Sequence, residues 1–154
     1  MMKERRVELL TAEHAEGLRV LSTDFAFAAA AGVSVGLSAE KAADYIAVAA
    51  KAREEGRSYV FVLVDGTVVM GVCRLIGIRG VPRLIVAIGL PYRGQGNGSF
   101  LVRHVLEFAF AKLGEERVTA SGPCLRLLAQ FGPLSGGQAL TRKDWQQTLD
   151  SERR

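Results

Sequence analysis

Cysteine and long apolar runs are scarce in this sequence of 154 residues, and each scarcity excludes a class of protein. The two cysteines, Cys73 and Cys124, match no zinc or iron–sulfur spacing, and we expect both thiols to be reduced. No apolar run is long enough to cross a membrane, and residues 1–6 lack the apolar core of a signal peptide. We therefore expect a cytoplasmic protein with no metal site and no membrane contact.

Aromatic residues and, in one long segment, acidic residues are also few. Aromatics make up 7% of the chain and Lys/Arg do not cluster, so nucleic acid is not an expected partner. No Asp or Glu lies between Gly66 and Leu106, whereas the arginines there are Arg74, Arg79, Arg83, Arg93 and Arg103. Such a segment favours a polyphosphate ligand; the alternative is that exposed arginines only keep strands and loops soluble.

The composition that remains, 49% hydrophobic and 23% charged residues, is typical of a globular rather than a disordered chain, and the α+β class follows from the resemblance described below. Its length predicts one domain over residues 1–154. Alternating and apolar runs predict strands over 6–10, 58–64, 67–76, 84–90, 117–120 and 137–140. Helical spacing and capping residues predict helices after Thr11 and Ser38, over 100–113 and 121–132, and after Thr141. Asp65-Gly66 is typical of a two-residue hairpin turn.

The most informative stretch is residues 92–99, Tyr-Arg-Gly-Gln-Gly-Asn-Gly-Ser, between an apolar strand and a helical pattern. Unpaired amides and the dipole at a helix start attract anions, and glycines let a backbone approach a phosphate closely. The dinucleotide fingerprint requires a third glycine where Ser99 stands, and the P-loop requires a Gly-Lys-Ser/Thr that is absent. A purely structural turn is the remaining alternative.

Residues 93–98 read Arg-x-x-Gly-x-Gly, which resembles the acetyl-CoA signature of the GNAT superfamily of N-acetyltransferases. The predicted order β-α-α-β-β-β-α-β-α-β is also the order of that superfamily. The resemblance implies an α/β/α sandwich with a mixed, mostly antiparallel sheet of about six strands. Segments 55–61, 92–96, 107–110 and 140–145 are most similar to the ribosomal-protein alanine N-acetyltransferase-like branch.

The same resemblance implies acetyl-CoA as co-substrate and assigns site residues. It places the CoA pyrophosphate on the turn formed by Arg93, Gly94, Gln95, Gly96, Asn97, Gly98 and Ser99. It places the pantetheine and the thioester carbonyl on the backbone of Ile88, Gly89 and Leu90, with Ser121 and Cys124 beside the pantetheine. Gly89 is interpreted either as a point of close ligand approach or as an ordinary core glycine.

Proton transfer is where the sequence departs from the family. Residues 84–90 hold no Glu to act as base, so the candidates are Asp24, Glu40 and Asp44, a neutral amine or ordered water. Where many relatives carry a tyrosine that protonates the thiolate, this chain has Leu128. Cys124 is a weak catalytic candidate, because a thiol donates poorly, and its other interpretation is a small buried side chain.

The acceptor side is expected to be small. Residues 26–36, rich in alanine and glycine, are interpreted as a loop over the acceptor pocket with Phe25 and Phe27 as walls, or as a helical turn in the core. Residues 132–137 replace a strand and hairpin of the family, which leaves the sheet edge there open or completed by a second copy in a homodimer.

These features predict an N-acetyltransferase that acetylates a primary amine of a small molecule or a protein N-terminus. The alternative is a catalytically weak GNAT-fold module that binds acyl-CoA as a sensor or interaction partner. Protein N-termini, polyamines, amino sugars and small metabolites all remain open as acceptors.

Overall fold

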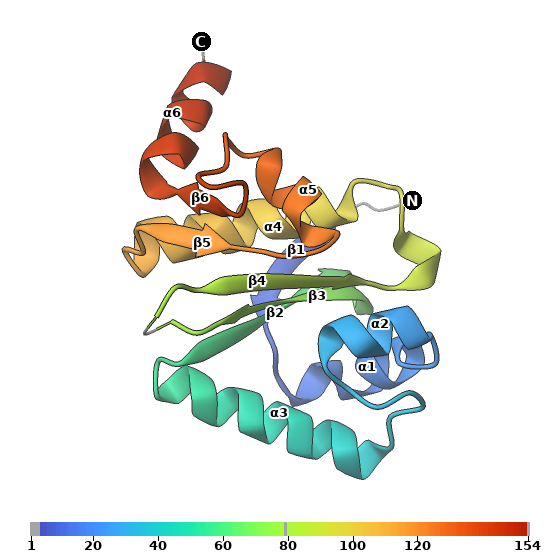
Figure 1. Ribbon diagram of the computed structural model, residues 1–154. Coiled ribbons are helices and arrows are strands. Elements are labelled where there is room, and N and C mark those ends of the chain that lie inside the picture. Colours follow the sequence, from blue (N-terminus) through green and yellow to red (C-terminus); the bar gives the residue numbers. More distant parts are fainter. Residues whose placement is uncertain (1–3, 79, 154) are drawn as a thin grey trace.

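A single mixed sheet organises the computed structural model, which describes residues 4–78 and 80–153 (Figure 1). The strands lie side by side in chain order, and all neighbours are antiparallel except β4 and β5, which are parallel. They are β1 (Arg5–Leu9), β2 (Ser58–Asp65), β3 (Val68–Ile76), β4 (Arg83–Ile88), β5 (Arg117–Thr119) and β6 (Ala139–Thr141). The predicted fold class is confirmed.

Helices cover both faces of the sheet (Figure 1). One face carries α1 (Ala15–Leu21), α2 (Phe25–Ala31) and α3 (Ala39–Glu54), after the short turn η1 (Ala12–His14). The other carries α4 (Asn97–Glu107), its wider last turn η3 (Phe108–Lys112), α5 (Cys124–Ala129) and α6 (Arg142–Glu152). A further short turn, η2 (Leu90–Tyr92), joins β4 to the segment before α4. None of the helices described is long and apolar enough to cross a bilayer.

The predicted capping residues begin their helices. The Ser38 hydroxyl accepts from the N–H of Lys41 at 3.1 Å, and the Thr141 hydroxyl accepts from the N–H of Asp144 at 3.1 Å. Thr11 caps η1, where the Thr11 N–H also donates to His14 Nδ1 at 2.9 Å. Because Nδ1 is the acceptor, His14 carries its proton on Nε2, which lies 2.8 Å from Glu8 Oε1.

Central strands are buried on both faces, because each face packs against its own helices. Val62 and Leu63, adjacent on β2, are both fully buried but belong to different clusters. Leu63 packs with the α4 side, including Leu101 and Phe110, whereas Val62 packs with the α1–α3 side. Burying side chains of this size contributes about 1.5–3 kcal/mol each, so both layers stabilise the sheet.

The alanine-rich segment follows the second of its two interpretations, a helical turn in the core. Residues 25–31 form α2, and Phe27 is 1% exposed in the core rather than a wall of an acceptor pocket. The hairpin loop is Gly66-Thr67, since Asp65 still pairs with Val68.

Gly89, directly after β4, is explained by packing. A Cβ at this position would lie 2.5 Å from Leu21 Cδ2 on α1 and 3.2 Å from the Met70 carbonyl. No side chain fits between α1 and the end of β4, so the core interpretation of this glycine holds.

Replacing Gly89 with alanine should therefore lower the free energy of unfolding by about 1–3 kcal/mol through overpacking, as measured by urea denaturation. Gly80→Ala is the matched control, since its Cβ would meet only the Gly77 carbonyl at 3.7 Å. The control should stay within about 0.5 kcal/mol of the wild type. Equal unfolding midpoints for the two variants would contradict this explanation of Gly89.

Candidate functional site

The glycine turn forms an open row of amides at the start of α4. Gly94 and Gly96 adopt positive φ angles of 72° and 81°, and a Cβ on either would meet nothing within 4 Å. The helix begins at Asn97, three residues before its predicted start. Within residues 4–78 and 80–153, the N–H groups of residues 94–99 have no hydrogen-bond acceptor. Unpaired amides at a helix N-terminus provide an anion site.

The side chains of the turn hold it in place. Asn97 is 1% exposed, and its Nδ2 donates to the Tyr92 carbonyl at 2.9 Å. Arg5 on β1 donates to Asn97 Oδ1 at 3.0 Å, and its guanidinium lies 4.2 Å from the centre of the Phe100 ring. Gln95 donates to the Pro91 carbonyl at 3.0 Å. Asn97 and Gln95 therefore face the protein, and what they present outward is backbone.

The start of α4 also packs against α5. Ser99 donates its hydroxyl proton to the side-chain oxygen of Gln130, and a Cβ at Gly98 would lie 3.2 Å from Leu127. Gly98 thus permits close contact between the two helices. The Ser99 hydroxyl is thus engaged with α5, and within the described residues the Ser99 main-chain N–H has no acceptor.

The second feature of the site is the divergence of β4 and β5. The two strands pair only at Arg83 and Thr119, where the Thr119 N–H donates to the Pro82 carbonyl at 2.8 Å. Gly89 N–H donates to Met70 on β3 at 2.8 Å, so by antiparallel alternation the amides of Val86 and Ile88 point to the opposite side. That side is the opening between β4 and β5.

The amides along this opening differ in what they contact. Val86 N–H donates to Cys124 Sγ at 3.4 Å. Within the described residues, the N–H groups of Ile88 and Leu90 have no acceptor. The resemblance placed the thioester carbonyl on the backbone of Ile88, Gly89 and Leu90. The Gly89 N–H donates to the Met70 carbonyl, so it is not available to polarise the thioester.

Arg93 ties the end of β4 to the first residues of α2. Its Nε donates to the Ile88 carbonyl at 3.0 Å, and its Nη2 pairs with Asp24 Oδ2. Asp24 also caps α2 by accepting from the Phe27 N–H at 3.0 Å. The Phe27 N–H first, and then the Arg93 guanidinium, hold the pKa of the Asp24 carboxyl below its usual value. Asp24, predicted as a possible base, is therefore an ionised partner of Arg93.

The remaining residues singled out in the sequence lie in three different places, in the core, on α3 and at the surface before α5. Leu128 is fully buried in the core, and α5 is shorter than predicted. Glu40 and Asp44 lie on α3, and Asp44 lines a surface hollow of about 270 Å³ with Lys41 and Tyr45. Ser121 is exposed just before α5. Within the described residues, no cluster of His, Cys, Asp and Glu could hold a metal ion.

Among the arginines of the acid-free segment, Arg79 lies outside the described residues, and Arg74, Arg93 and Arg103 already have partners within the chain. Arg74 donates to the Ala30 carbonyl at 2.9 Å, and Arg103 lies 3.8 Å from Glu152. With Arg93 paired to Asp24, the anion site depends mainly on main-chain N–H groups.

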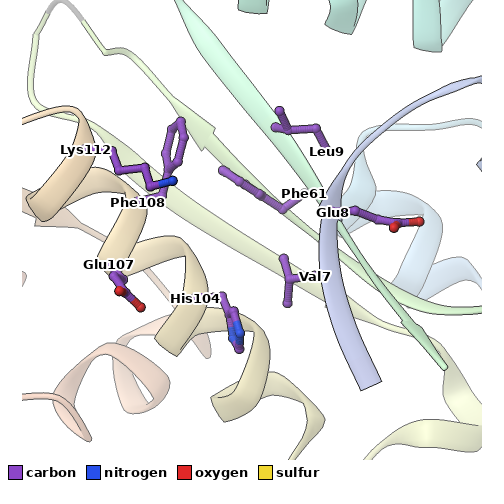
Figure 2. Close-up of a pocket in the computed structure, with 8 residues that line it drawn as sticks. All are labelled: Val7, Glu8, Leu9, Phe61, His104, Glu107, Phe108 and Lys112. Atoms are coloured by element: carbon purple, nitrogen blue, oxygen red, sulfur yellow. The ribbon is translucent and has the colours of Figure 1, made fainter. Parts of the chain in front are cut away.

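A pocket of about 370 Å³ lies away from the turn, between β1 and α4–η3 (Figure 2). Val7, Leu9, Phe61 and Phe108 form its apolar part, and His104, Glu107 and Lys112 approach it from the helix (Figure 2). No sequence motif marked this pocket, because its residues come from three separate segments.

Comparison with known families identifies the family of this chain. Residues 6–121 match the model of the acetyltransferase (GNAT) domain, so the chain belongs to the GNAT acetyltransferase family and is an acyltransferase by that membership. This confirms the family predicted from residues 92–99 and from the order of elements. Comparison with curated protein sequences finds no match.

Solved structures share the fold at low sequence identity. A spermidine N-acetyltransferase from Vibrio cholerae, in complex with CoA and spermine, is 13% identical with a TM-score of 0.72, over 92% of this chain and 98% of that one. A ribosomal-protein-S5-alanine acetyltransferase from Vibrio fischeri is 14% identical with a TM-score of 0.71, over 94% and 97%. A ribosomal L7/L12 alpha-N-protein acetyltransferase in complex with coenzyme A is 13% identical with a TM-score of 0.63, over 77% and 70%.

The Asp24–Arg93 pair should make stability depend on pH. Asp24→Asn keeps a helix cap but removes the charge, so it should unfold at lower urea than the wild type near neutral pH. The pKa of Asp24 in the folded protein is lower than its ordinary value of 3.8. The ionised carboxylate therefore stabilises the fold fully at a pH above 3.8, and this stabilisation is lost as the pH falls through the pKa of the folded state. The difference between the two urea midpoints should therefore shrink in acid, and a difference that persists there would contradict the charge pairing.

Proposed function

We propose that this chain is an N-acetyltransferase that transfers the acetyl group of acetyl-CoA to the primary amine of an acceptor. The observation that carries the proposal is that two groups of main-chain N–H donors have no acceptor within the described residues. One group is residues 94–99 at the glycine turn, and the other is Ile88 and Leu90 along the opening between β4 and β5. The likeness to CoA-bound acetyltransferases supports it. A single domain over residues 1–154 and a place in the ribosomal-protein acetyltransferase-like branch are also part of the proposal.

The turn fits the diphosphate of CoA in shape and charge. Space around Gly94 and Gly96 lets the backbone approach the ligand, and the N–H groups up to Ser99 supply donors for its oxygens. The pantetheine arm would extend from there into the opening between β4 and β5. Cys124 Sγ is a weak acceptor for Val86 N–H, so an amide oxygen of the arm can replace it. Ser121, exposed just before α5, is proposed to lie beside the arm.

Acetyl transfer forms a C–N bond and breaks the C–S bond of the thioester. The amine nitrogen attacks the acetyl carbonyl carbon, the sulfur leaves as thiolate, and the amine gives up one proton. Negative charge develops on the carbonyl oxygen, and the Ile88 or Leu90 N–H is the donor that stabilises it. Arg93 holds the Ile88 carbonyl and thereby fixes the backbone between these amides.

The contacts around Asp24 restrict the choice of acceptor. Polyamines need free carboxylates, but Asp24 is already paired with Arg93. Phe25, next to it on α2, is 74% exposed, and Leu90, the first residue of η2, is 60% exposed. We propose an acceptor whose amine stands next to an apolar group, such as a protein N-terminus, and whose proton leaves through water.

Leu128 favours a second candidate function. No hydroxyl stands at its buried position to protonate the thiolate, and β4 carries no carboxylate. The alternative is therefore a catalytically weak GNAT-fold protein that binds acyl-CoA as a sensor or interaction module.

Gly96→Val should weaken acetyl-CoA binding about tenfold or more in isothermal titration, because the strained backbone turns its amides away from the ligand. Gly114→Val is the matched control: Gly114 has a φ angle of 69° and equally open surroundings, but it ends the helix far from the turn. Both variants should lose similar stability, and only Gly96→Val should lose binding. Equal affinities for acetyl-CoA would contradict the site.

Release of free thiol during incubation with a panel of amines separates the two functions. An enzyme with water-mediated deprotonation should turn over faster as the pH rises toward the pKa of the amine. Peptides with a small or apolar N-terminal residue should be better acceptors than spermidine. Acetyl-CoA binding without thiol release on any amine would leave the sensor as the function.

A further inference from the structure

β1 is an edge strand whose outward main-chain groups are free. Leu10 N–H donates to the Val60 carbonyl at 2.9 Å, and Glu8 and Arg6 follow in the same register opposite Val62 and Val64. By antiparallel alternation, the N–H and C=O groups of Arg5, Val7 and Leu9 point away from β2. In the part of the chain that the structure describes, no element pairs with this side of β1.

The opposite edge of the sheet is protected. β6 spans only residues 139–141, and Ser135 folds back onto it. The Ser135 N–H donates to the Ala139 carbonyl at 2.7 Å, and the Ala139 N–H donates to the Ser135 carbonyl at 3.2 Å. The edge left available for a partner is therefore β1, not the β6 edge suggested by the short segment 132–137.

We propose that a second copy of this chain pairs with β1 in an antiparallel fashion, across a two-fold axis at Val7. Val7 then faces Val7 of the partner subunit, and the two residues exchange their outward hydrogen bonds. The outward groups of Arg5 and Leu9 pair in the same way across the axis. The result is one sheet that continues through both copies.

Charge fixes this register. Arg6 and Glu8 lie on one face, 3.1 Å apart between Nε and Oε2, with 52% and 35% of their side chains exposed. With the axis at Val7, Arg6 stands opposite Glu8 of the partner subunit, and Glu8 stands opposite Arg6 of the partner subunit. If the register slips by two residues in one direction, Arg6 faces Arg6 of the partner subunit. If it slips in the other direction, Glu8 faces Glu8 of the partner subunit. In both cases the like charges repel.

The other face of β1 supplies apolar surface. Val7 and Leu9 line the pocket of about 370 Å³ next to the free edge, together with Phe61 and Phe108 (Figure 2). A second copy at this edge removes part of that surface from water, which favours association. Glu107 and Lys112, which line the pocket from α4 and η3, carry opposite charges. Their charges cancel, so this pair adds no net repulsion between the two copies.

The test uses two charge-reversal variants of the full chain, Arg6→Glu and Glu8→Arg, in sedimentation equilibrium over about a hundredfold range of concentration. The wild type should be a reversible dimer. Each variant alone places like charges opposite each other twice, so its dissociation constant should rise about tenfold or more. An equimolar mixture of the two variants restores opposite charges at both positions and should dimerise about as tightly as the wild type.

Two controls keep folding and position separate from pairing. Glu8→Arg also loses the contact with His14, so melting temperatures are measured for every variant, and Arg6→Glu carries the test if Glu8→Arg melts early. Arg142→Glu reverses a charge beside β6 and should leave association unchanged. Hydrogen exchange of the Val7 and Leu9 amides should slow as the protein concentration rises.

A wild-type chain that is monomeric at every concentration would overturn the proposal and leave the edge to a different partner. So would a dimer that tolerates both single variants, or a mixture of the variants that stays monomeric. None of these measurements involves acetyl-CoA, so their outcome is independent of the proposed enzymatic function.

Discussion

The structure depends on the divergence of two parallel strands. β4 and β5 share one pairing, at Arg83 and Thr119, and then separate. In an uninterrupted sheet, β5 would accept the outward hydrogen bonds of β4. Beyond that pairing, and within the described residues, the Val86 N–H finds the weak sulfur of Cys124, and the Ile88 and Leu90 N–H groups have no acceptor. The opening therefore leaves donors unpaired along the end of β4.

Internal hydrogen bonds keep those donors in place. The buried amide of Asn97 links Tyr92 to Arg5 of β1, so the start of α4 is fastened to the sheet across its width. Arg93 links the last residue of β4 to the helix cap at Asp24. Arg5 and Arg93 thus hold the backbone in place, and in the proposed function the anion is bound by main-chain N–H groups. A site of this kind is already oriented before the ligand arrives, which is what electrostatic stabilisation requires.

The sequence predicted the sheet, its helices and the turn because each has a local cause. Alternation defines the strands, Ser38 and Thr141 define helix starts, and the glycines at 94 and 96 define a turn with positive φ. What it could not predict depends on neighbours distant in the chain. The role of Gly89 is set by Leu21, the burial of Phe27 by the packing of α2, and the ion pair of Arg93 by Asp24, 69 residues away. The pocket beside β1 and the proposed pairing of β1 with a second copy likewise depend on geometry that no local pattern encodes.

The central proposal is that main-chain amides at the turn, and those of Ile88 and Leu90, bind acetyl-CoA. Amide chemical shifts of an isotope-labelled chain, followed by NMR during titration with CoA and acetyl-CoA, test it most directly. We expect large shifts at residues 94–99 with either ligand, and further shifts at Ile88 and Leu90 that differ between the two ligands. The shifts at Gly89, whose N–H stays paired to Met70, should be smaller. Shifts confined to the pocket between β1 and α4, or no shifts at the turn, would contradict it.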